Sequence, residues 1–536
     1  MKQTIFTILM PALLCSCSQD PWWEDAMGDE VATRPQPSDP LPADSIDESW
    51  GCELWQDYVR AAKAGDRSVL LDYSYAGYAC GERDIPDADY RVYDVTDFGA
   101  VANDDKSDRQ ALVSAIAAAV ASKQSAIVYF PEGRFIIRDS NSENSSIVID
   151  GDNIVLRGAG SGKTTLAMSA PNQPLDHTLW NTPELITFTR RSARADDKLL
   201  LTKVCGEARK GSHKVDVASA SHLFPGQRVL LKATCNEPEA VKAEVAPYSV
   251  ESEWKELTQE GVKVTEYLQV LRVSGRTIEF KQPLMHDIDP SWGWTIHAYD
   301  CHTGCGVEDI TFEGNFTMPF NHHGSALDDS GYRALTFHRQ ADGWIRRCRF
   351  INVSEAASVM LSCNVSVTDC SIDGNGGHSA IRAQASSHTL LARISDNAGQ
   401  YHSVGVSKTS IGTVILQASI APSSCFESHS SQPRATLIDN CSGGMNPFHA
   451  GGDAAAGPNH LADLTLWNYR ETGGPGGTMD LWVRNNRFLM PIIAGYQGNT
   501  SFMPQQVTAD LSHGCAVEPR SLYLAQLNLR LMNKIH

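Results

Sequence analysis

The segment Val367-Thr-Asp-Cys-Ser-Ile-Asp-Gly-Asn375 reads as a short alternating strand that ends at an Asp-Gly-Asn turn. The same scheme occurs on both sides of it, in Glu308–Asn315, Ile345–Asn352, Leu391–Asn397 and Ala435–Asn440. The closing asparagines are 23 residues apart from Asn352 to Asn375 and 22 from Asn375 to Asn397, and the 43 residues to Asn440 fit two units. One strand-and-turn unit repeated at this period predicts a β-solenoid.

The asparagines suit the turns of such a solenoid. Asn tolerates left-handed backbone, and Asn side chains stacked on successive coils can hydrogen-bond to one another. The neighbouring carboxylates Asp373, Asp396 and Asp439 are therefore expected to serve the turns.

Composition limits the classes of partner. With 536 residues, 42% hydrophobic and 20% charged, the chain is globular, and one repeated coil can account for most of its length. The net charge of −18 argues against nucleic acid as a partner, although a local basic groove remains compatible with it. Gly158–Thr165 resembles a phosphate loop, but Arg157 stands where the first glycine belongs, so no nucleotide partner is expected.

The N-terminus predicts export. Met1–Ser16 has a positive start and an apolar run of signal-peptide length, and Leu14-Cys-Ser-Cys17 resembles a bacterial lipobox, with Cys17 as the lipidated residue. An acidic, Pro-rich stalk is expected over 17–48. The predicted location is the outer membrane, at the cell surface or on the periplasmic face. In that oxidising setting Cys301/Cys305 and Cys52/Cys80 are candidate disulfides, with free thiols as the alternative.

Two segments carry a family resemblance. Tyr93-Asp-Val-Thr-Asp-Phe-Gly-Ala100 leads through an Asp/Ser cluster into the Ala-rich run Arg109–Ser122, and Val128–Ile137 follows with a Pro-Glu-Gly turn. This resembles the opening of the pectate-lyase-like superfamily. The resemblance implies an all-β fold, a right-handed single-stranded parallel β-helix with inserted loops, acting mainly on polysaccharides. The Ala/Ile/Val face of the helix can cover the open end of the solenoid and act as an N-terminal cap.

The predicted organisation follows from these features. Residues 49–92 form an N-terminal segment in which Tyr73–Glu82 resembles a stretch of surface polysaccharide lyase lipoproteins from gut Bacteroides-type bacteria. The β-helix covers 93–480, with insertions at Asp176–Asp197 and Asn236–Val262 that are expected to border a binding site. Residues 481–536 are closing coils and a C-terminal cap.

Histidines recur at about one per coil. His378, His402, His429 and His449 are separated by 24, 27 and 20 residues, so they are expected to form a column on one face. Tyr401 lies beside it, and a basic flank is expected from Arg382, Lys408 and Arg434. An earlier group includes His338, Arg339 and the pair His322-His323, which sits in a turn-like segment that could line the same groove or lie at the surface.

This column suits a polysaccharide lyase acting on a glycosaminoglycan such as chondroitin sulfate, or on pectin. Such an enzyme needs a base, a cation beside the uronate carboxylate and an acid for the leaving oxygen. We predict His402 or His429 as the base, Arg434 or Lys408 as the cation and Tyr401 as the acid. The predicted substrate contacts are His378, His449, Arg382, Arg339 and His338.

Alternatives remain open at this stage. The histidines could be structural, stacked because like side chains pack well. A glycoside hydrolase on the same fold would use two carboxyl groups among Asp373, Asp396, Glu427, Asp439 and Asp453. A non-catalytic glycan-binding β-helix is the third class. No ligand spacing predicts a metal site, no cofactor is required, and calcium is left open.

Overall fold

The computed structural model describes residues 49–192, 199–483 and 486–533. The predicted signal peptide 1–16, the stalk 17–48 and the lipidation site Cys17 lie outside these residues. Within them, no helix is long and apolar enough to cross a membrane.

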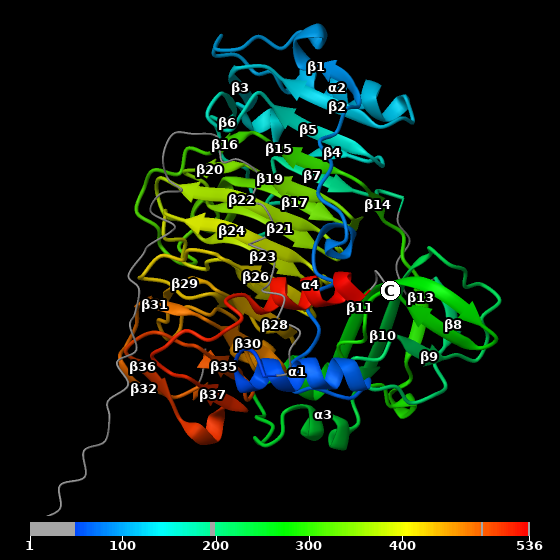
Figure 1. Cartoon of the computed structure of the whole chain (residues 1–536). Helices are drawn as coiled ribbons and strands as arrows, with labels where there is room; N and C mark the ends of the chain where they lie inside the picture. The colour runs from blue at the N-terminus through cyan, green and yellow to red at the C-terminus, as the bar shows by residue number, and fades with distance from the viewer. Residues whose placement is uncertain (1–48, 193–198, 484–485, 534–536) are drawn as a thin grey trace, which may run out of the picture. The chain divides into compact units, whose positions relative to one another are not determined.

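Most strands belong to two parallel sheets (Figure 1). The larger, called sheet A here, has 16 strands. Its strands are β1 (Arg91–Asp94), β2 (Ala126–Phe130), β3 (Gly133–Arg138), β5 (Ile154–Gly158), β6 (Thr164–Met168), β15 (Gly306–Glu308), β16 (Thr311–Glu313), β19 (Trp344–Arg346), β20 (Arg349–Ile351), β22 (Ser366–Asp373), β24 (Leu390–Asp396), β26 (Ile411–Leu416), β28 (Arg434–Asp439), β30 (Leu464–Trp467), β35 (Ile492–Ala494) and β37 (Ala509–Leu511).

The second sheet, called sheet B, has seven strands. They are β4 (Ile147–Ile149), β7 (Ile186–Thr189), β17 (Arg333–His338), β21 (Glu355–Met360), β23 (Ser379–Gln384), β25 (Gly405–Ser407) and β27 (Glu427–Ser428). From β22 to β28 the chain alternates between the sheets, so each coil gives one strand to each. This is the winding of a parallel β-solenoid; its handedness stays a prediction.

The register confirms the sequence repeat. Val367 pairs with Leu391, Leu391 with Ile415 and Ile415 with Ile438, all in parallel. The first, second and fourth of these residues lie in predicted repeat segments, and the third lies in the coil that the double spacing required. Asn352 and Asn440 adopt left-handed backbone, with φ of 52° and 51°. The Asn352 side chain accepts a hydrogen bond from the Asn375 backbone at 2.9 Å, which links neighbouring coils.

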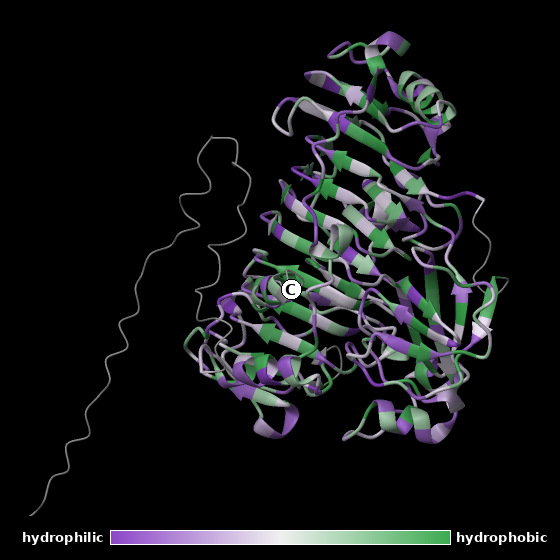
Figure 2. Ribbon diagram, turned by 45° about the vertical axis from the view of Figure 1, so that its right-hand side comes forward, coloured by the Kyte–Doolittle hydropathy of each residue, from purple (hydrophilic) through white to green (hydrophobic). Residues whose placement is uncertain are grey.

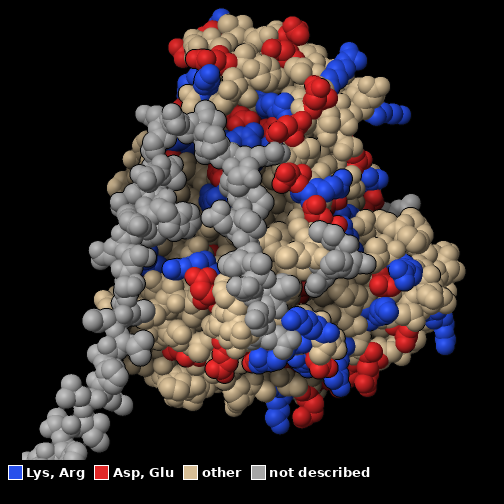
Figure 3. Space-filling model, in the orientation of Figure 1, with Lys and Arg blue, Asp and Glu red and all other residues tan. Residues whose placement is uncertain are grey.

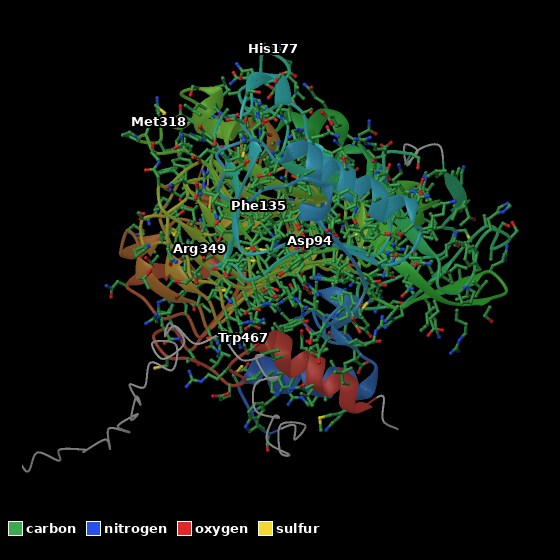
Figure 4. All side chains as sticks on the ribbon, turned by 90° about the horizontal axis from the view of Figure 1, so that it is seen from above. Asp94, Phe135, His177, Met318, Arg349 and Trp467 are labelled. Carbon is green, nitrogen blue, oxygen red and sulfur yellow. The ribbon has the colours of Figure 1, made fainter. Side chains whose placement is uncertain are left out.

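Apolar side chains from both sheets fill the interior. Hydrophobic positions follow the stacked strands in Figure 2, and one continuous buried cluster runs from Tyr93 to Val507. Figure 4 looks down the stack, with the fully buried Phe135 inside and the exposed His177 and Met318 at the periphery. The interior is thus dry and packed, so any chemistry must take place on an outer face.

Helix α2 (Arg109–Ala121) packs against the first strands, as its Ala-rich sequence predicts. Leu112, Ala115 and Ala119 are buried and join the solenoid core, next to β1, β2 and β3. The loop that resembled a phosphate loop is the turn from β5 to β6, with Thr164 bonded to the Phe130 and Pro131 carbonyls at 3.2 and 2.9 Å.

A large insertion separates β7 from the later coils. It contains a six-stranded antiparallel sheet made of β8 (Leu200–Lys203), β9 (Lys214–Asp216), β10 (Arg228–Cys235), β11 (Val262–Ser274), β12 (Thr277–Phe280) and β13 (Thr295–Ala298), with helix α3 (Pro238–Glu244). The sequence predicted only two shorter insertions in a coil, Asp176–Asp197 and Asn236–Val262. The inserted sheet was not predicted because the strands of antiparallel and parallel sheets share the same alternation of side chains.

The two ends of the described chain meet. Helix α1 (Glu53–Ala64) begins beside the C-terminal segment, where the Cys52 N–H donates to Glu518 O at 2.8 Å. Helix α4 (Leu522–Asn533) packs on residues 71–82: the Gln526 amide bonds with the Tyr73 N–H and the Leu71 carbonyl at 3.0 and 2.8 Å. Strands β35 and β37 continue sheet A past residue 480.

Short strands complete the coils: β14 (His302–Thr303), β18 (Gln340–Ala341), β29 (Ser442–Gly444), β31 (Arg470–Gly473), β32 (Gly477–Met479), β33 (Trp482–Val483), β34 (Asn486–Arg487) and β36 (Thr500–Phe502). All twelve cysteines of the described chain are free, so the pairings Cys301/Cys305 and Cys52/Cys80 are wrong. Cys80, Cys305 and six others are buried, where a thiol behaves as a small apolar side chain.

Candidate functional site

The outer face of sheet B carries a row of buried charged groups. The register aligns Ser358, Arg382, Gly405 and Glu427 on successive strands. Arg382 donates to Glu355 at 3.0 Å and to Glu427 at 3.3 Å, and Arg333 pairs with Glu355 at 2.7 Å. Because Gly405 has no side chain, the row leaves a gap between Arg382 and Glu427.

Histidine rings gather around this row, as predicted. The ring centres of His378 and His402 are 5.1 Å apart, and those of His402 and His429 are 5.0 Å apart. His449 joins through Tyr401, at 5.0 Å. We call these five residues, with His322 described below, the histidine cluster.

The four predicted histidines do not occupy equivalent coil positions. His378 and His402 precede β23 and β25, and a bridge pairs His402 with Ser379. His429 instead follows β27, and its ring meets that of His402 across the gap at Gly405. His449 comes from the loop between β29 and β30. The single column was wrong because coil lengths vary, yet side chains from both ends of the strands still converge.

The loop from β16 to β17 supplies a further ring. His322 stacks on Tyr401 at 4.1 Å with an interplanar angle of 21°, and lies 5.6 Å from His378. Buried Asp329 holds this loop by accepting from the His323 N–H at 3.0 Å and by contacting the His323 ring at 2.7 Å. The His-His pair was noted in the sequence, but outside the repeat nothing could place it against His378.

Burial and neighbouring charges lower the pKa of three of the imidazoles, those of His322, His402 and His429. Burial, with neighbouring rings and Arg382, lowers the pKa of His402 well below its usual value and also lowers that of His429. Burial and His323 lower the pKa of His322 to about 4. Among the carboxyls, burial raises the pKa of Glu427 to about 7, whereas for Glu355 the burial penalty is outweighed by Arg333 and Arg382, which hold its pKa low.

Unpaired polar atoms converge on the cluster. Nε2 of His322, Nε2 of His378, Nδ1 of His402 and Oε2 of Glu427 are buried and have no hydrogen-bond partner in the described part of the chain. Each such atom costs roughly 1–3 kcal/mol if nothing satisfies it. This concentration on one face indicates a place for a ligand.

The predicted cations divide between two places. Arg382 lies in the site. The Lys408 side chain remains exposed, but partial desolvation lowers its pKa, and the nearby charge of Arg382 lowers that pKa further. Arg434 does not reach the cluster. It begins β28 in sheet A, pairs with Glu244 at 2.7 Å and faces the inserted sheet. The prediction for Arg434 was wrong because residues a few positions apart along a coil belong to different sheets.

The remaining predicted contacts lie farther along sheet B. His338, at the end of β17, bonds through Nδ1 with Thr189 at 2.8 Å, and Arg339 is buried with left-handed backbone. On the side of the molecule seen in Figure 3, acidic and basic side chains are interspersed.

Most rival carboxylates are structural, as the turn pattern predicted. Asp373 bonds Arg349 and Asn397, Asp396 accepts from Ser403 at 2.7 Å, and Asp439 accepts from three donors at the start of α4. Asp453 caps a short helical turn. Glu427 alone of the five lies in the histidine cluster region.

A cavity of 1540 Å³ lies elsewhere, between the inserted sheet and the later coils. Several of its charged groups are paired with one another, with Lys210 on Asp463 at 2.7 Å, Arg434 on Glu244 at 2.7 Å and His286 on Glu244 at 3.3 Å. None of the predicted histidines of the cluster lines this cavity. The unpaired atoms make sheet B the stronger candidate.

Two comparisons bear on the family. Residues 92–193 match the family described as rhamnogalacturonase A/epimerase, pectate lyase-like, which supports the resemblance found in the opening coils. Residues 399–535 match a domain of unknown function, DUF4955, which includes Tyr401, His402, Glu427 and His429. No curated protein matches the chain.

Several solved structures are similar to the chain at low sequence identity. The tailspike protein gp49 of Pseudomonas phage LKA1 is 12% identical, with 79% of this chain and 81% of that one covered and a TM-score of 0.41. An exopolygalacturonase from Thermotoga maritima is 11% identical, with 81% and 88% covered and a TM-score of 0.33. PfbA, a surface adhesin of Streptococcus pneumoniae, is 11% identical, with 79% and 92% covered and a TM-score of 0.30. Similarity at this level carries no functional information.

Proposed function

We propose that the protein is a polysaccharide lyase that cleaves a uronic-acid-containing glycan by β-elimination on the outer face of sheet B. The observation that carries the proposal is the convergence of unpaired, buried polar atoms and unprotonated imidazoles beside Tyr401. The match of the opening coils to a pectate lyase-like family supports a polysaccharide as substrate.

Accessibility assigns the roles. His402 is 2% exposed, so it cannot contact a polymer, although its sequence position suggested the base. His322 is partly exposed, has an unpaired Nε2 and stacks on Tyr401. In the proposal His322 takes the proton alpha to the uronate carboxylate, the C4–O4 bond breaks as the C4=C5 bond forms, and the Tyr401 hydroxyl protonates the leaving oxygen.

The rim of the site suits a sugar chain. Phe448 and Trp180 are exposed by 56% and 55%, and Trp180 lies 5.9 Å from the His323 ring. Exposed aromatic faces beside a polar centre are suited to stack on sugar rings. Lys408 is the exposed cation available to the substrate carboxylate.

A glycoside hydrolase is less well supported. It needs two carboxyl groups free to flank the glycosidic bond. Glu355 and Glu427 are both buried, and Arg382 is held between them, so neither is free for that role.

The test is a panel of uronic-acid polymers, glycosaminoglycans and pectins, incubated with the purified chain. Ultraviolet absorbance of the new C4=C5 bond, with matching reducing ends, is the expected result. Reducing ends without that absorbance would establish hydrolysis, and binding without either product would establish an adhesive β-helix.

We also propose that the chain is exported and anchored by a lipid at Cys17. The support is the lipobox-like sequence alone. Mass spectrometry of protein from a bacterial membrane fraction should show a lipid-modified N-terminal cysteine, and Cys17→Ala should release the protein from that fraction. An unmodified Cys17 in the mature chain would refute the anchor.

A further inference from the structure

Three side chains around the gap at Gly405 have the arrangement of metal ligands. Glu427 Oε1 lies 3.9 Å from His402 Nδ1 and 4.0 Å from His429 Nε2. One ligand atom from each residue lies within 4.8 Å of the others. Tetrahedral zinc with bonds near 2.1 Å places its ligands roughly 3.4 Å apart, so the two pairs that involve Glu427 need to close by about half an ångström and the pair of histidines by at most about 1.4 Å.

Two glycines allow the backbone to approach the three side chains closely. A Cβ at Gly405 would lie 2.5 Å from the Glu427 Cβ and 2.1 Å from its carbonyl oxygen. A Cβ at Gly451, whose φ is +89°, would lie 2.5 Å from the His429 ring and 3.2 Å from His402 Nδ1. A side chain at either position would therefore collide with one of the three proposed ligand residues.

The ligand atoms themselves lack partners. His402 Nδ1 and Glu427 Oε2 are buried and unpaired among the described residues, while the His429 side chain is 35% exposed. An ion would satisfy the two buried atoms at once, and the exposed side would leave a coordination position for water or substrate.

We propose that His402, Glu427 and His429 form a binding site for a divalent transition-metal ion, with zinc as the reference case. Two imidazoles and one carboxylate with an open position match catalytic zinc sites. Calcium, which sequence analysis left open, prefers six to eight oxygen ligands and does not fit this donor set. Arg382 donates to Glu427 Oε1 at 3.3 Å, which orients the carboxylate whose Oε1 lies 3.9 and 4.0 Å from the two ring nitrogens.

A bound ion would also affect the proposed lyase reaction, and this part of the inference rests on the proposed function. Arg333 and Arg382 are already paired with Glu355 and Glu427, so neither guanidinium is free for the substrate carboxylate. A bound divalent cation would add to the charge of Lys408 a second positive charge next to His322 and Tyr401.

Calorimetric titration of the purified, chelator-treated full chain with zinc chloride tests the site, without glycan. We expect one tight equivalent, and with cobalt chloride a visible ligand-field absorption from imidazole ligation. Glu427→Gln and His429→Asn should each weaken binding by at least about tenfold. His322→Asn is the matched control, because it changes a neighbouring trio formed by His322, His378 and His402.

Any one of three outcomes would refute the proposed metal site. They are no tight equivalent in the unchanged chain, wild-type affinity in both ligand variants, or a loss on His322→Asn with none on His429→Asn. Since the His429 side chain is partly exposed, its variant should fold even if Glu427→Gln does not, and circular dichroism checks both. If the chain binds the ion but forms no unsaturated product, the proposed lyase activity is refuted and the metal site stands. If the chain has lyase activity but binds no ion, the metal site is refuted and the proposed lyase activity stands.

Discussion

The outer faces of sheets A and B are built from the same coils but treat their polar groups differently. On sheet A charged side chains form satisfied pairs between coils, such as Arg347 with Asp309 at 2.7 Å and Arg393 with Asp369 at 2.6 Å. On sheet B the polar groups of the histidine cluster are buried and left partly unpaired. Both faces share one backbone, and we propose that the face of sheet B is the working face because its polar groups are left unpaired among the described residues.

The largest expected effect comes from the working face. His322→Ala and Tyr401→Phe should each lower kcat/KM by about 10²–10⁴-fold, because each removes a proton-transfer group. The midpoint of unfolding should change little, since both side chains are partly exposed. Activity on the responsive polymer and a thermal melt are the measurements.

The control for that experiment is His222→Ala, an exposed histidine on the inserted sheet, which should retain full activity. If it loses as much activity as His322→Ala, the assignment of the working face fails.

Replacing Glu308 should lower the stability of the protein and leave its activity unchanged, the opposite of the result expected for His322 and Tyr401. It is fully buried on sheet A and bonds Arg157, Arg346 and the Trp344 indole. Glu308→Ala strands two guanidinium groups and should lower the free energy of unfolding by about 3–5 kcal/mol. Activity per folded molecule should remain. Denaturant unfolding followed by assay of the native fraction measures both, and a stable but inactive variant would contradict the comparison.

Asp439 should have an intermediate effect on stability. At the end of β28 it accepts from Ser521 Oγ at 2.6 Å and from the Leu522 and Tyr523 N–H groups at 3.1 and 2.8 Å. Asp439→Ala leaves these donors unpaired and should cost about 1–3 kcal/mol. Hydrogen exchange should show the loss concentrated in α4, and uniform loosening of all coils would argue against a local role.

The smallest effect is expected for the half-exposed pair of Arg393 and Asp369. The side chains are 32% and 29% exposed, so water screens their attraction. Arg393→Ala should change the free energy of unfolding by about 1 kcal/mol or less. A loss as large as that of Glu308→Ala would show that position on sheet A, rather than burial, sets the energy.

The sequence predicted the coils well because a repeated strand and turn has one physical solution. Val367, Leu391 and Ile438 all fall in register as the Asn spacing required. The inserted sheet was missed because alternation does not distinguish antiparallel from parallel pairing. Within the site, the convergence of His378, His402 and His429 was predicted. The stacking of His322 on Tyr401 and the displacement of Arg434 to another sheet depend on loop paths, for which sequence spacing holds no signal.

The contact between the two ends of the described chain bears on the order of folding. Tyr73 meets Gln526 across 453 residues, and the same segment also bonds the coils, where the Tyr78 N–H donates to Ser366 and the Gly77 N–H donates to the His388 carbonyl. Contacts between such distant residues form late, since the chain entropy of closing the loop is lost before the contact is gained. The segment that follows α1 is therefore expected to dock onto coils that have already formed, and its contact with α4 joins the two ends late in folding.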